Sequence, residues 1–503
     1  AASDVYKRQD AGRSPGDVCD RRSHAVVVDR PGHRGCASKH RRTRDRNRHT
    51  RRSDGGPDII TDPGTGNNTD VAGNRRTVTL DHDAHHSPTT PWQRVSSKWI
   101  GLFGLSWLGI WLAQLAPFQL TLPNQINDWL DIGTNVNESN WKQGVLTFGV
   151  VSGISAVFAL VAFPLTGSLS DRTTSRYGRR RPWIVGGTAL FAAGLIALGF
   201  SDNIIAITIG WCATLTGFSA VSAALTALIS DQVPVFQRGV VSSWVSAPQA
   251  IGVIIGIALV SAFGLGFLPS YALFAVLLIA CVAPFVLYLN DPPNPRHDKG
   301  RISIRAVVSE LWISPREHPD FGWTLLGRVL VNLGNALGTS LLFFFLKFGI
   351  HSTDADNDIL LVTAVYMVFV VISALVSGKL SDVVGRRKPF VLAAGVSQGA
   401  AAVCIAVVAN LPMTMVAAAL LGAGFGAFLG VDQALATQVL PDAEHNGQDL
   451  GIMNIAMAVP QALGPLVGAA IVEATGGFTG LFVASAIFGI LGGVSVLLVR
   501  SVR

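Results

Sequence analysis

The stretch GSLSDRTTSRYGRRRP (167–182) decides the fold, because it returns as GKLSDVVGRRKP (378–389) about 210 residues later. An internal repeat of this length indicates two copies of one structural unit. The chain therefore reads as two related halves. Two further pairs of segments recur at a similar spacing: ISDQVPVFQRG (229–239) with ATQVLPDAEHNG (436–447), and SAPQAIGVIIGIAL (246–259) with AVPQALGPLVGAAI (458–471).

Long apolar runs surround these segments. The 503 residues are 49% hydrophobic and only 14% charged, with a mean hydropathy of +0.42, whereas soluble domains carry about 25% charged residues. From Trp99 onward the apolar runs are long enough to cross roughly 30 Å of hydrocarbon as helices. We predict twelve membrane-spanning helices, at 99–121, 144–167, 183–201, 203–229, 239–263, 268–289, 322–346, 358–378, 389–410, 412–437, 449–473 and 478–499.

The repeats divide these helices six and six. Each repeated segment falls at the same place relative to its own six helices, so the predicted fold is an all-α integral membrane protein with two pseudo-symmetric six-helix bundles. We expect an N-terminal half at 99–289, a cytoplasmic connector at 290–321 and a C-terminal half at 322–503. Carriers that open alternately to the two sides of a membrane are built from such halves, with the binding site between them.

The net charge of +7 belongs to the first 98 residues. They hold 19 basic and 12 acidic residues, while residues 99–503 hold 20 of each. This Arg-rich segment includes HRRTRDRNRHTRR (40–52) and has too little apolar surface to form a core. We predict a disordered cytoplasmic tail rather than an arm for nucleic acid or anionic lipid. The chain opens on Ala1, so a native origin of the tail stays open.

The loops also predict the orientation. If the tail is cytoplasmic, 17 basic residues lie on the cytoplasmic side and only Lys142 and Lys347 lie on the other. Cytoplasmic loops carry the excess of Lys and Arg, so we expect both termini in the cytoplasm and the protein in the plasma (inner) membrane. The loop 438–448 departs from the pattern, since it contains no Lys or Arg.

The repeated G-x-L-S-D pattern with its Arg-rich turn resembles the loop signature of the major facilitator superfamily, over the whole 400-residue membrane part. Within it, SDRTTSRYGRRRPWI (170–184) and GQDLGIMNIAMAVPQ (447–461) are similar to the corresponding segments of sucrose carriers and of the glycoside–cation symporter group. The resemblance implies the major facilitator fold, and we expect a monomer that functions without a cofactor, a metal or nucleic acid.

In that family the loop is taken to latch the two halves on the cytoplasmic side. Here the Arg residues of the loop also favour its cytoplasmic location, and that role alone is the simpler alternative. The predicted cytoplasmic gate comprises Gly167, Asp171, Arg172, Gly178, Arg179, Arg180, Gly378, Asp382, Gly385, Arg386 and Arg387.

A polar stripe in the seventh helix indicates the coupling site. Arg328, Asn332, Asn335 and Thr339 follow the spacing i, i+4, i+7, i+11 and share one helical face. An Arg inside the membrane is costly unless it is paired, and Asp432 in the tenth helix lies at a similar depth. We predict that Arg328 and Asp432 couple transport to protons, with a purely structural ion pair as the alternative.

The first helix carries Trp107, Trp111, Gln114 and Phe118 at the same spacing. Neutral amides, hydroxyls and aromatic faces suit a neutral polyhydroxylated ligand, although helix packing explains each residue singly. Further amides lie beside prolines that should kink their helices: Gln249 beside Pro248, and Asn454 and Gln461 beside Pro460. The predicted substrate-binding residues are Trp107, Trp111, Gln114, Phe118, Gln249, Asn332, Asn335, Tyr366, Asn454 and Gln461.

These features predict a secondary active transporter that takes up a sugar or glycoside by proton symport. The alternative is a drug/proton antiporter that exports small apolar compounds; its Gly-Pro-x-x-Gly-Gly signature is missing from the fifth helix, where the sequence reads PQAIGVIIG. The coupling ion, proton or sodium, and the identity of the substrate stay open. The reason is that residues 204–229 lack the basic residue expected in plant sucrose carriers. A membrane sensor is a third possibility, and no enzymatic motif is present.

Overall fold

The computed structural model describes residues 94–132, 138–291, 318–436 and 446–500, and over these residues it is helical, without strands. Most of the predicted tail, of the connector and of the loop 438–448 lies outside the described residues. Within these described ranges, twelve helices are long and apolar enough to cross a membrane. The predicted all-α membrane fold with twelve spans is therefore confirmed.

The N-terminal half contains six spans. The first is continuous through three segments, and its π-helical part η2 begins at Pro117, which has no backbone N–H to donate. This span runs eight residues beyond the predicted end at 121. The segments are α1 (Ser97–Ala116), η2 (Pro117–Thr121), α2 (Leu122–Trp129), α3 (Glu138–Asp171), α4 (Arg181–Gly199), α5 (Ile204–Gln232), α6 (Val235–Phe263) and α7 (Phe267–Tyr288).

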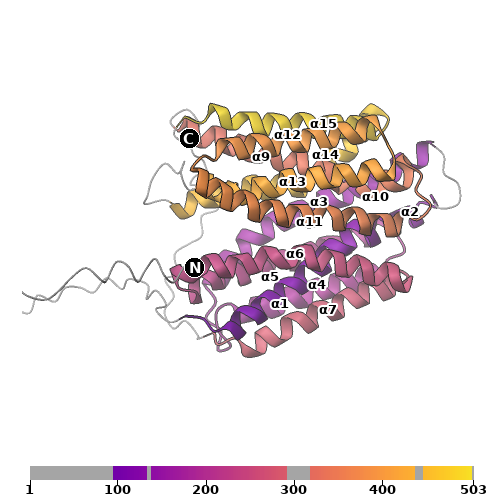
Figure 1. The fold of residues 1–503 in the computed structure, drawn as a ribbon. Helices are drawn as coiled ribbons and strands as arrows, with labels where there is room; N and C mark the ends of the chain where they lie inside the picture. The colour runs from indigo at the N-terminus through magenta and orange to yellow at the C-terminus, as the bar shows by residue number, and fades with distance from the viewer. Residues whose placement is uncertain (1–93, 133–137, 292–317, 437–445, 501–503) are drawn as a thin grey trace, which may run out of the picture. The chain divides into compact units, whose positions relative to one another are not determined.

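The C-terminal half repeats this arrangement, including a π-helical segment late in its first span. Its segments are α9 (Pro319–Ser340), α10 (Leu342–Phe344), η3 (Phe345–Gly349), α11 (Ala355–Val384), α12 (Lys388–Val407), α13 (Leu411–Ala436), α14 (Asn446–Thr475), α15 (Phe478–Ser495) and η4 (Val496–Leu498). Figure 1 shows the labelled helices of the two halves lying alongside one another.

Local sequence explains where the helices begin and end. The Ser96 side chain accepts a hydrogen bond from the Trp99 amide at 3.1 Å and caps α1. In the two repeated loops, α4 and α12 each begin at the last basic residues and have a Pro in the first turn, where its missing N–H costs nothing. The repeated motif therefore fixes the start of the third helix in each half.

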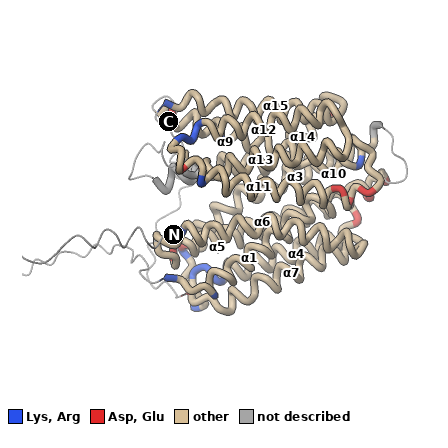
Figure 2. Tube along the Cα trace, viewed as in Figure 1, with Lys and Arg blue, Asp and Glu red and all other residues tan. Residues whose placement is uncertain are grey.

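Most charged residues lie at the two ends of the helices, as Figure 2 shows. We call the end that carries Arg179–Arg181, Arg386–Lys388 and Arg500 the basic end. The opposite end carries Asp128, Asp131, Asp354, Asp356 and Asp358, and we call it the acidic end.

The halves meet chiefly through α3 with α14 and through α6 with α11. A Cβ added to Gly149 of α3 would lie 2.5 Å from the Ala469 Cβ of α14, so the two helices approach closely. Among the described residues, the hydrogen bonds and ring contacts that join the halves lie toward the acidic end. They are Asn124–Asp356, Ser261–Asp356, Gln119–Thr363, Phe148–Phe344, Trp141–Phe348 and Trp141–Phe478. The structure is thus closed between the halves at the acidic end.

Close packing inside the C-terminal half can be tested at Gly426 of α13, where an added Cβ would lie 2.2 Å from the Val370 oxygen of α11. Overpacking of this kind costs about 1–3 kcal/mol, so Gly426→Ala should lower the melting temperature of the purified protein. Gly186→Ala is the control, since an added Cβ there meets nothing within 4 Å. Equal melting temperatures for the two variants would contradict the tight α11–α13 contact.

Candidate functional site

A buried ion pair lies within the C-terminal half. Nη2 of Arg328 on α9 is 3.0 Å from Oδ2 of Asp432 on α13, and the two side chains are 1% and 3% exposed. Arg328 lies nine residues into α9, about 13 Å along the helix axis at 1.5 Å per residue. Asp432 lies four residues before the end of α13. A charged side chain this deep in a membrane is costly unless an opposite charge lies next to it, and here each of the two charges has the other.

The pair does not use all of the Arg328 hydrogen-bond donors. Nη2 also lies 3.9 Å from the Met457 sulfur of α14, while Nε and Nη1 have no partner among the described residues. A buried guanidinium group with unpaired N–H groups is costly. Arg328 can therefore bind a further acceptor beside Asp432.

Amide and hydroxyl contacts continue from the pair along α9. Asn332 donates to the Arg328 carbonyl oxygen at 2.8 Å and accepts from Gln461 Nε2 at 3.2 Å. One turn further on, Asn335 Oδ1 accepts from the Tyr366 hydroxyl of α11 at 3.0 Å. Beyond Arg328, the predicted stripe thus makes two separate contacts with other helices, one to α14 through Asn332 and one to α11 through Asn335.

A separate hydrogen bond from α11 reaches the N-terminal half. The Thr363 hydroxyl, one turn before Tyr366 on α11, donates to Oε1 of Gln119 at 2.9 Å. Gln119 lies in the π-helical segment η2 and was not among the predicted site residues. Since the prediction assumed a regular helix through Phe118, it could not place Gln119; Pro117 was the available signal for a local change of helix type.

The predicted residues of α1 form an aromatic face. Trp107 and Trp111 have ring centroids 5.8 Å apart, and Trp111 Nε1 donates to the Val245 carbonyl oxygen at 2.8 Å. Phe118 packs against the rings of Phe148 and Trp211. Trp111 and Phe118 are therefore held by partners within the N-terminal half.

Several polar atoms of the N-terminal half are buried without a partner among the described residues, including Trp107 Nε1 and Gln114 Oε1. Leaving such groups unpaired costs roughly 1–3 kcal/mol each, so they mark where a ligand can add hydrogen bonds. Gln249 is half-buried in α6, and the Asn454 side chain lies outside the described part of α14. The described contacts do not bring the ten predicted substrate residues into one cluster.

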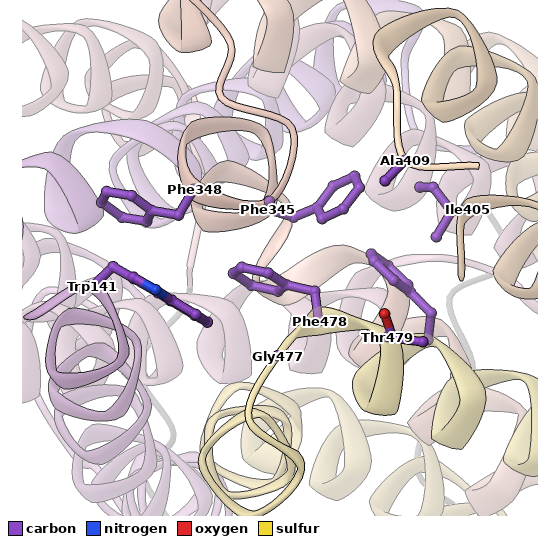
Figure 3. Close-up of a pocket in the computed structure, with 10 residues that line it drawn as sticks. Trp141, Phe345, Phe348, Ile405, Ala409, Gly477, Phe478 and Thr479 are labelled. Atoms are coloured by element: carbon purple, nitrogen blue, oxygen red, sulfur yellow. The ribbon is translucent and has the colours of Figure 1, made fainter. Parts of the chain in front are cut away.

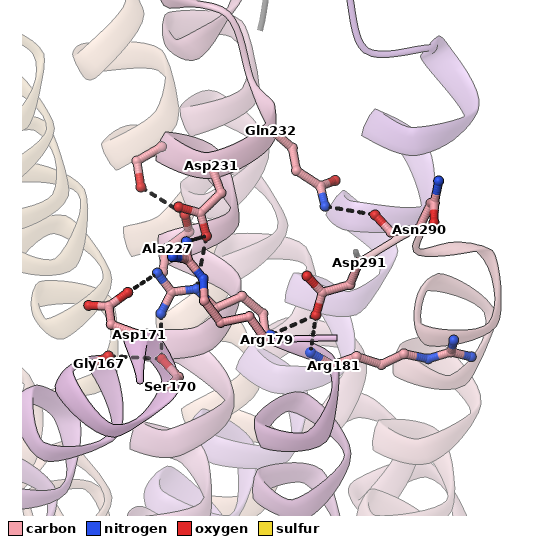
Figure 4. Close-up of polar contacts among 12 residues, drawn as sticks. Gly167, Ser170, Asp171, Arg179, Arg181, Ala227, Asp231, Gln232, Asn290 and Asp291 are labelled. Atoms are coloured by element: carbon pink, nitrogen blue, oxygen red, sulfur yellow. Dashed lines mark hydrogen bonds and ion pairs between the residues drawn. The ribbon is translucent and has the colours of Figure 1, made fainter. Parts of the chain in front are cut away.

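The repeated loop of the N-terminal half forms a polar cluster at the basic end (Figure 4). The buried Arg180 side chain binds Ser170 and Asp171, and its Nε donates to Asp231 Oδ2 at 2.9 Å. Arg179 reaches the same carboxylate at 2.6 Å. Partial burial lowers the pKa of Arg179, but the hydrogen bond and charge of Asp231 outweigh it and leave this pKa raised.

A second carboxylate holds the start of α4. Asp291 Oδ2 accepts from the backbone amides of Arg180 and Arg181 at 2.6 and 2.8 Å, where the helix N-terminus favours negative charge. The tight turn before it requires Gly178, whose φ is +104°. Neither Asp231 nor Asp291 was predicted as a gate residue, although Asp231 lies in the repeated segment 229–239.

The second copy of the loop is more open. Arg387 Nη2 and Asp382 Oδ1 are 3.7 Å apart, and the Asp382 side chain is 71% exposed. Gly385 ends α11 in the left-handed conformation, with φ of +66°. The ion pairs of Arg179 and Arg180 lie within the N-terminal half, and the Arg387–Asp382 pair lies within the C-terminal half.

An aromatic pocket of about 210 Å³ lies at the acidic end. Figure 3 shows the side chains that line it. Trp141 of the N-terminal half lines it together with residues of the C-terminal half. The Trp141 ring stacks 5.1 Å from Phe478 and 6.3 Å from Phe348. The lining residues are Trp141, Phe345, Phe348, Gly349, Ile405, Ala409, Gly477, Phe478, Thr479 and Phe482.

Twelve spans in two repeated halves, with polar side chains buried between the helices, define a membrane transport protein. The family model of the Major Facilitator Superfamily matches residues 129–355 and 328–503. The chain belongs to this superfamily, as its repeated loop predicted.

The similar proteins carry names of different kinds of transport protein. The Multidrug resistance protein MdtG of Dickeya zeae is 24% identical over 403 residues, which cover 76% of this chain and 90% of MdtG. The General alpha-glucoside permease of Schizosaccharomyces pombe is 30% identical over 195 residues, 36% of this chain and 32% of the permease. The Inner membrane transport protein YajR of Escherichia coli is 33% identical over 176 residues, 33% of this chain and 36% of YajR.

A shorter match involves Sucrose transport protein SUC3 of Arabidopsis thaliana, which is 44% identical over 48 residues, or 10% of this chain and 8% of SUC3. The chain thus spans about a third of YajR and of the glucoside permease and less than a tenth of SUC3. These likenesses support transport of small molecules through a membrane.

The basic-end cluster gives a stability prediction. Asp231→Asn removes a charged acceptor from Arg179 and Arg180 and should cost about 1–3 kcal/mol, seen as a lower melting temperature. Asp382→Asn alters the exposed pair of the other half and should cost about 0–1 kcal/mol. An equal loss in both variants would show that burial of Arg180 does not set the strength of the cluster.

Proposed function

We propose that this protein takes up a sugar or glycoside together with protons. The observation that carries the proposal is the Arg328–Asp432 pair, buried at 1% and 3% exposure and continuous with the amide contacts of α9. A carboxylate that is desolvated but paired with Arg can be ionised while the pair is intact and protonated when it opens. The pair therefore has the chemistry that proton coupling needs.

The unpaired donors of Arg328 suggest how substrate and proton communicate. A substrate oxygen that accepts from Nε or Nη1 competes with Asp432 for the same guanidinium group. Weakening the pair favours protonation of Asp432, because the neutral acid loses less by burial than the carboxylate does. Binding of substrate and proton would then favour one another, as symport requires.

The substrate class follows from the neutral groups beside the pair. Asn332, Asn335, Gln461 and Tyr366 offer amides and a hydroxyl, which match a ligand with many hydroxyl groups. The printed names of an alpha-glucoside permease and sucrose transport proteins among the relatives support the same class.

We further propose that the basic end faces the cytoplasm and the acidic end faces outward, as the positive-inside bias indicates. Both termini are then cytoplasmic in the plasma membrane, with the 1–98 tail and the 290–321 connector on that side. The latch at the repeated loops would form when the basic end closes. In the present structure the acidic end is closed, which corresponds to access from the cytoplasm.

Export of apolar compounds is the second candidate, because the alignment with the multidrug resistance protein of Dickeya zeae spans 76% of this chain. Uptake of labelled sucrose, maltose and a cationic dye into proteoliposomes, with and without an imposed pH gradient, separates the two. We expect gradient-driven sugar uptake. Dye movement without sugar movement would favour the exporter.

The coupling pair gives a direct prediction. Asp432→Asn cannot release a proton, so it should lose uphill accumulation of the sugar while retaining exchange across the membrane. The readout is accumulation under a pH gradient beside counterflow without one. Asp202→Asn, on the exposed loop between α4 and α5, is the matched control and should accumulate sugar normally. Normal accumulation by the Asp432→Asn protein would contradict the assignment.

The substrate-facing groups give another prediction. Tyr366→Phe removes the donor to Asn335 and should weaken sugar transport several-fold, roughly the effect of one hydrogen bond, mainly as a higher KM. The measurement is the concentration dependence of uptake. Thr208→Val is the comparison, because the Thr208 hydroxyl donates only within its own helix, to the Ile204 oxygen. An unchanged KM in Tyr366→Phe would remove this residue from the substrate site.

A further inference from the structure

Two asparagines lie one turn apart on α2, at the acidic end. Asn124 donates through Nδ2 to Oδ1 of Asp356 in the C-terminal half, at 3.1 Å. Asn127 follows at i+3 and so lies on the same side of the helix. It is only 1% exposed, and neither Nδ2 nor Oδ1 has a hydrogen-bond partner among the described residues. The same helix face thus carries one satisfied and one unsatisfied amide.

Asn127 lies beside Gly144 of α3, close to a residue of the other half. A Cβ placed on Gly144 of α3 would lie 2.7 Å from Asn127 Oδ1, 2.9 Å from Ile132 and 3.7 Å from Phe344 of the C-terminal half. The Phe344 ring packs in turn on Phe148 of α3, with centroids 5.3 Å apart. The Asn127 amide is therefore enclosed at the point where the halves touch.

This enclosure costs free energy in one state only. A buried amide without a partner forfeits its hydrogen bonds to water. If the acidic end opens, Phe344 would move away with its half and water could reach the amide. The Asn124–Asp356 hydrogen bond has the opposite effect and stabilises the closed acidic end, since it exists only while the halves are together.

We propose that Asn127 is a built-in destabiliser of the acidic-end closure, which offsets the Asn124–Asp356 bond and the ring packing so that the closure can reopen. A carrier turns over only if its two states differ by a few kcal/mol, because a deep minimum in either state would trap it. The unpartnered amide of Asn127 keeps this free-energy difference small by destabilising the closed state.

The test uses spin-label distances on the full chain in lipid nanodiscs, in a background with the five cysteines replaced. Labels at Asp202 and Ala409, on the exposed loops after α4 and α12, report on the acidic end. Labels at Thr174 and Val383, both exposed, report on the basic end. Closing one end should open the other.

Asn127→Leu keeps the size of the side chain and removes the unsatisfied amide, so the ratio of closed to open acidic ends should rise roughly ten-fold. Asn127→Asp keeps the shape but raises the cost of burial, and should shift the ratio toward open. Asn124→Ala should also shift it toward open. A residue needed only for packing would not respond in opposite directions to Leu and Asp.

Gln398→Met is the matched control. Gln398 of α12 is also fully buried with both amide atoms unpartnered, but it contacts Gly424 and Gly489 within the C-terminal half. This variant should leave both label distances unchanged. The proposal is overturned if Asn127→Leu leaves the ratio unchanged or moves it toward open, or if Gln398→Met shifts it equally. The test requires no transported substrate, so it stands apart from the sugar assignment.

Discussion

Hydrocarbon offers no hydrogen-bond partners, and this constraint shapes every span of the protein. The helices satisfy the backbone, and many hydroxyls bond back to their own helix, as Thr214 does to the Gly210 oxygen at 2.8 Å. Polar groups that cannot be satisfied in this way stand out. Arg328 and Asp432 form an ion pair that leaves Nε and Nη1 of Arg328 unpartnered among the described residues, and the amides of Asn127 and Gln398 have no partner there. The positions of such groups, more than the apolar surface around them, distinguish this carrier from a generic bundle of twelve helices.

The two halves share a scaffold but differ in chemistry. The first helix of each half carries a stripe at the same spacing, aromatic in α1 and polar in α9. The α9 stripe makes contacts to α11, α13 and α14, while Trp111 and Phe118 are held by other helices of their own half. The two halves therefore contribute different groups. The C-terminal half contains the charged pair, and the stripe of the N-terminal half is largely aromatic. Motion of one half against the other can then change access without dismantling the pair.

The sequence predicted the spans and the shared depth of Arg328 and Asp432, because hydropathy and helix rise determine both. It did not predict that α2 extends the first span, or that Gln119 turns toward Thr363, because Pro117 introduces a π-helical segment whose geometry a regular spacing does not describe. Asp231 and Asp291 were missed for another reason. Their role depends on loops from distant parts of the chain meeting at Arg180, which only the packed structure brings together.

The closure at the acidic end and the clusters at the basic end are built in different ways. The closure rests on rings, on glycines of α3 against α14 and on a few hydrogen bonds, so modest changes such as those at Asn127 can shift it. At the basic end, Arg180 is already committed to partners within its own half. The carboxylates of Asp171 and Asp382 nevertheless remain 56% and 71% exposed. If the basic end closes as proposed, these two carboxylates could accept contacts from the opposite half while the buried bonds of Arg180 stay intact.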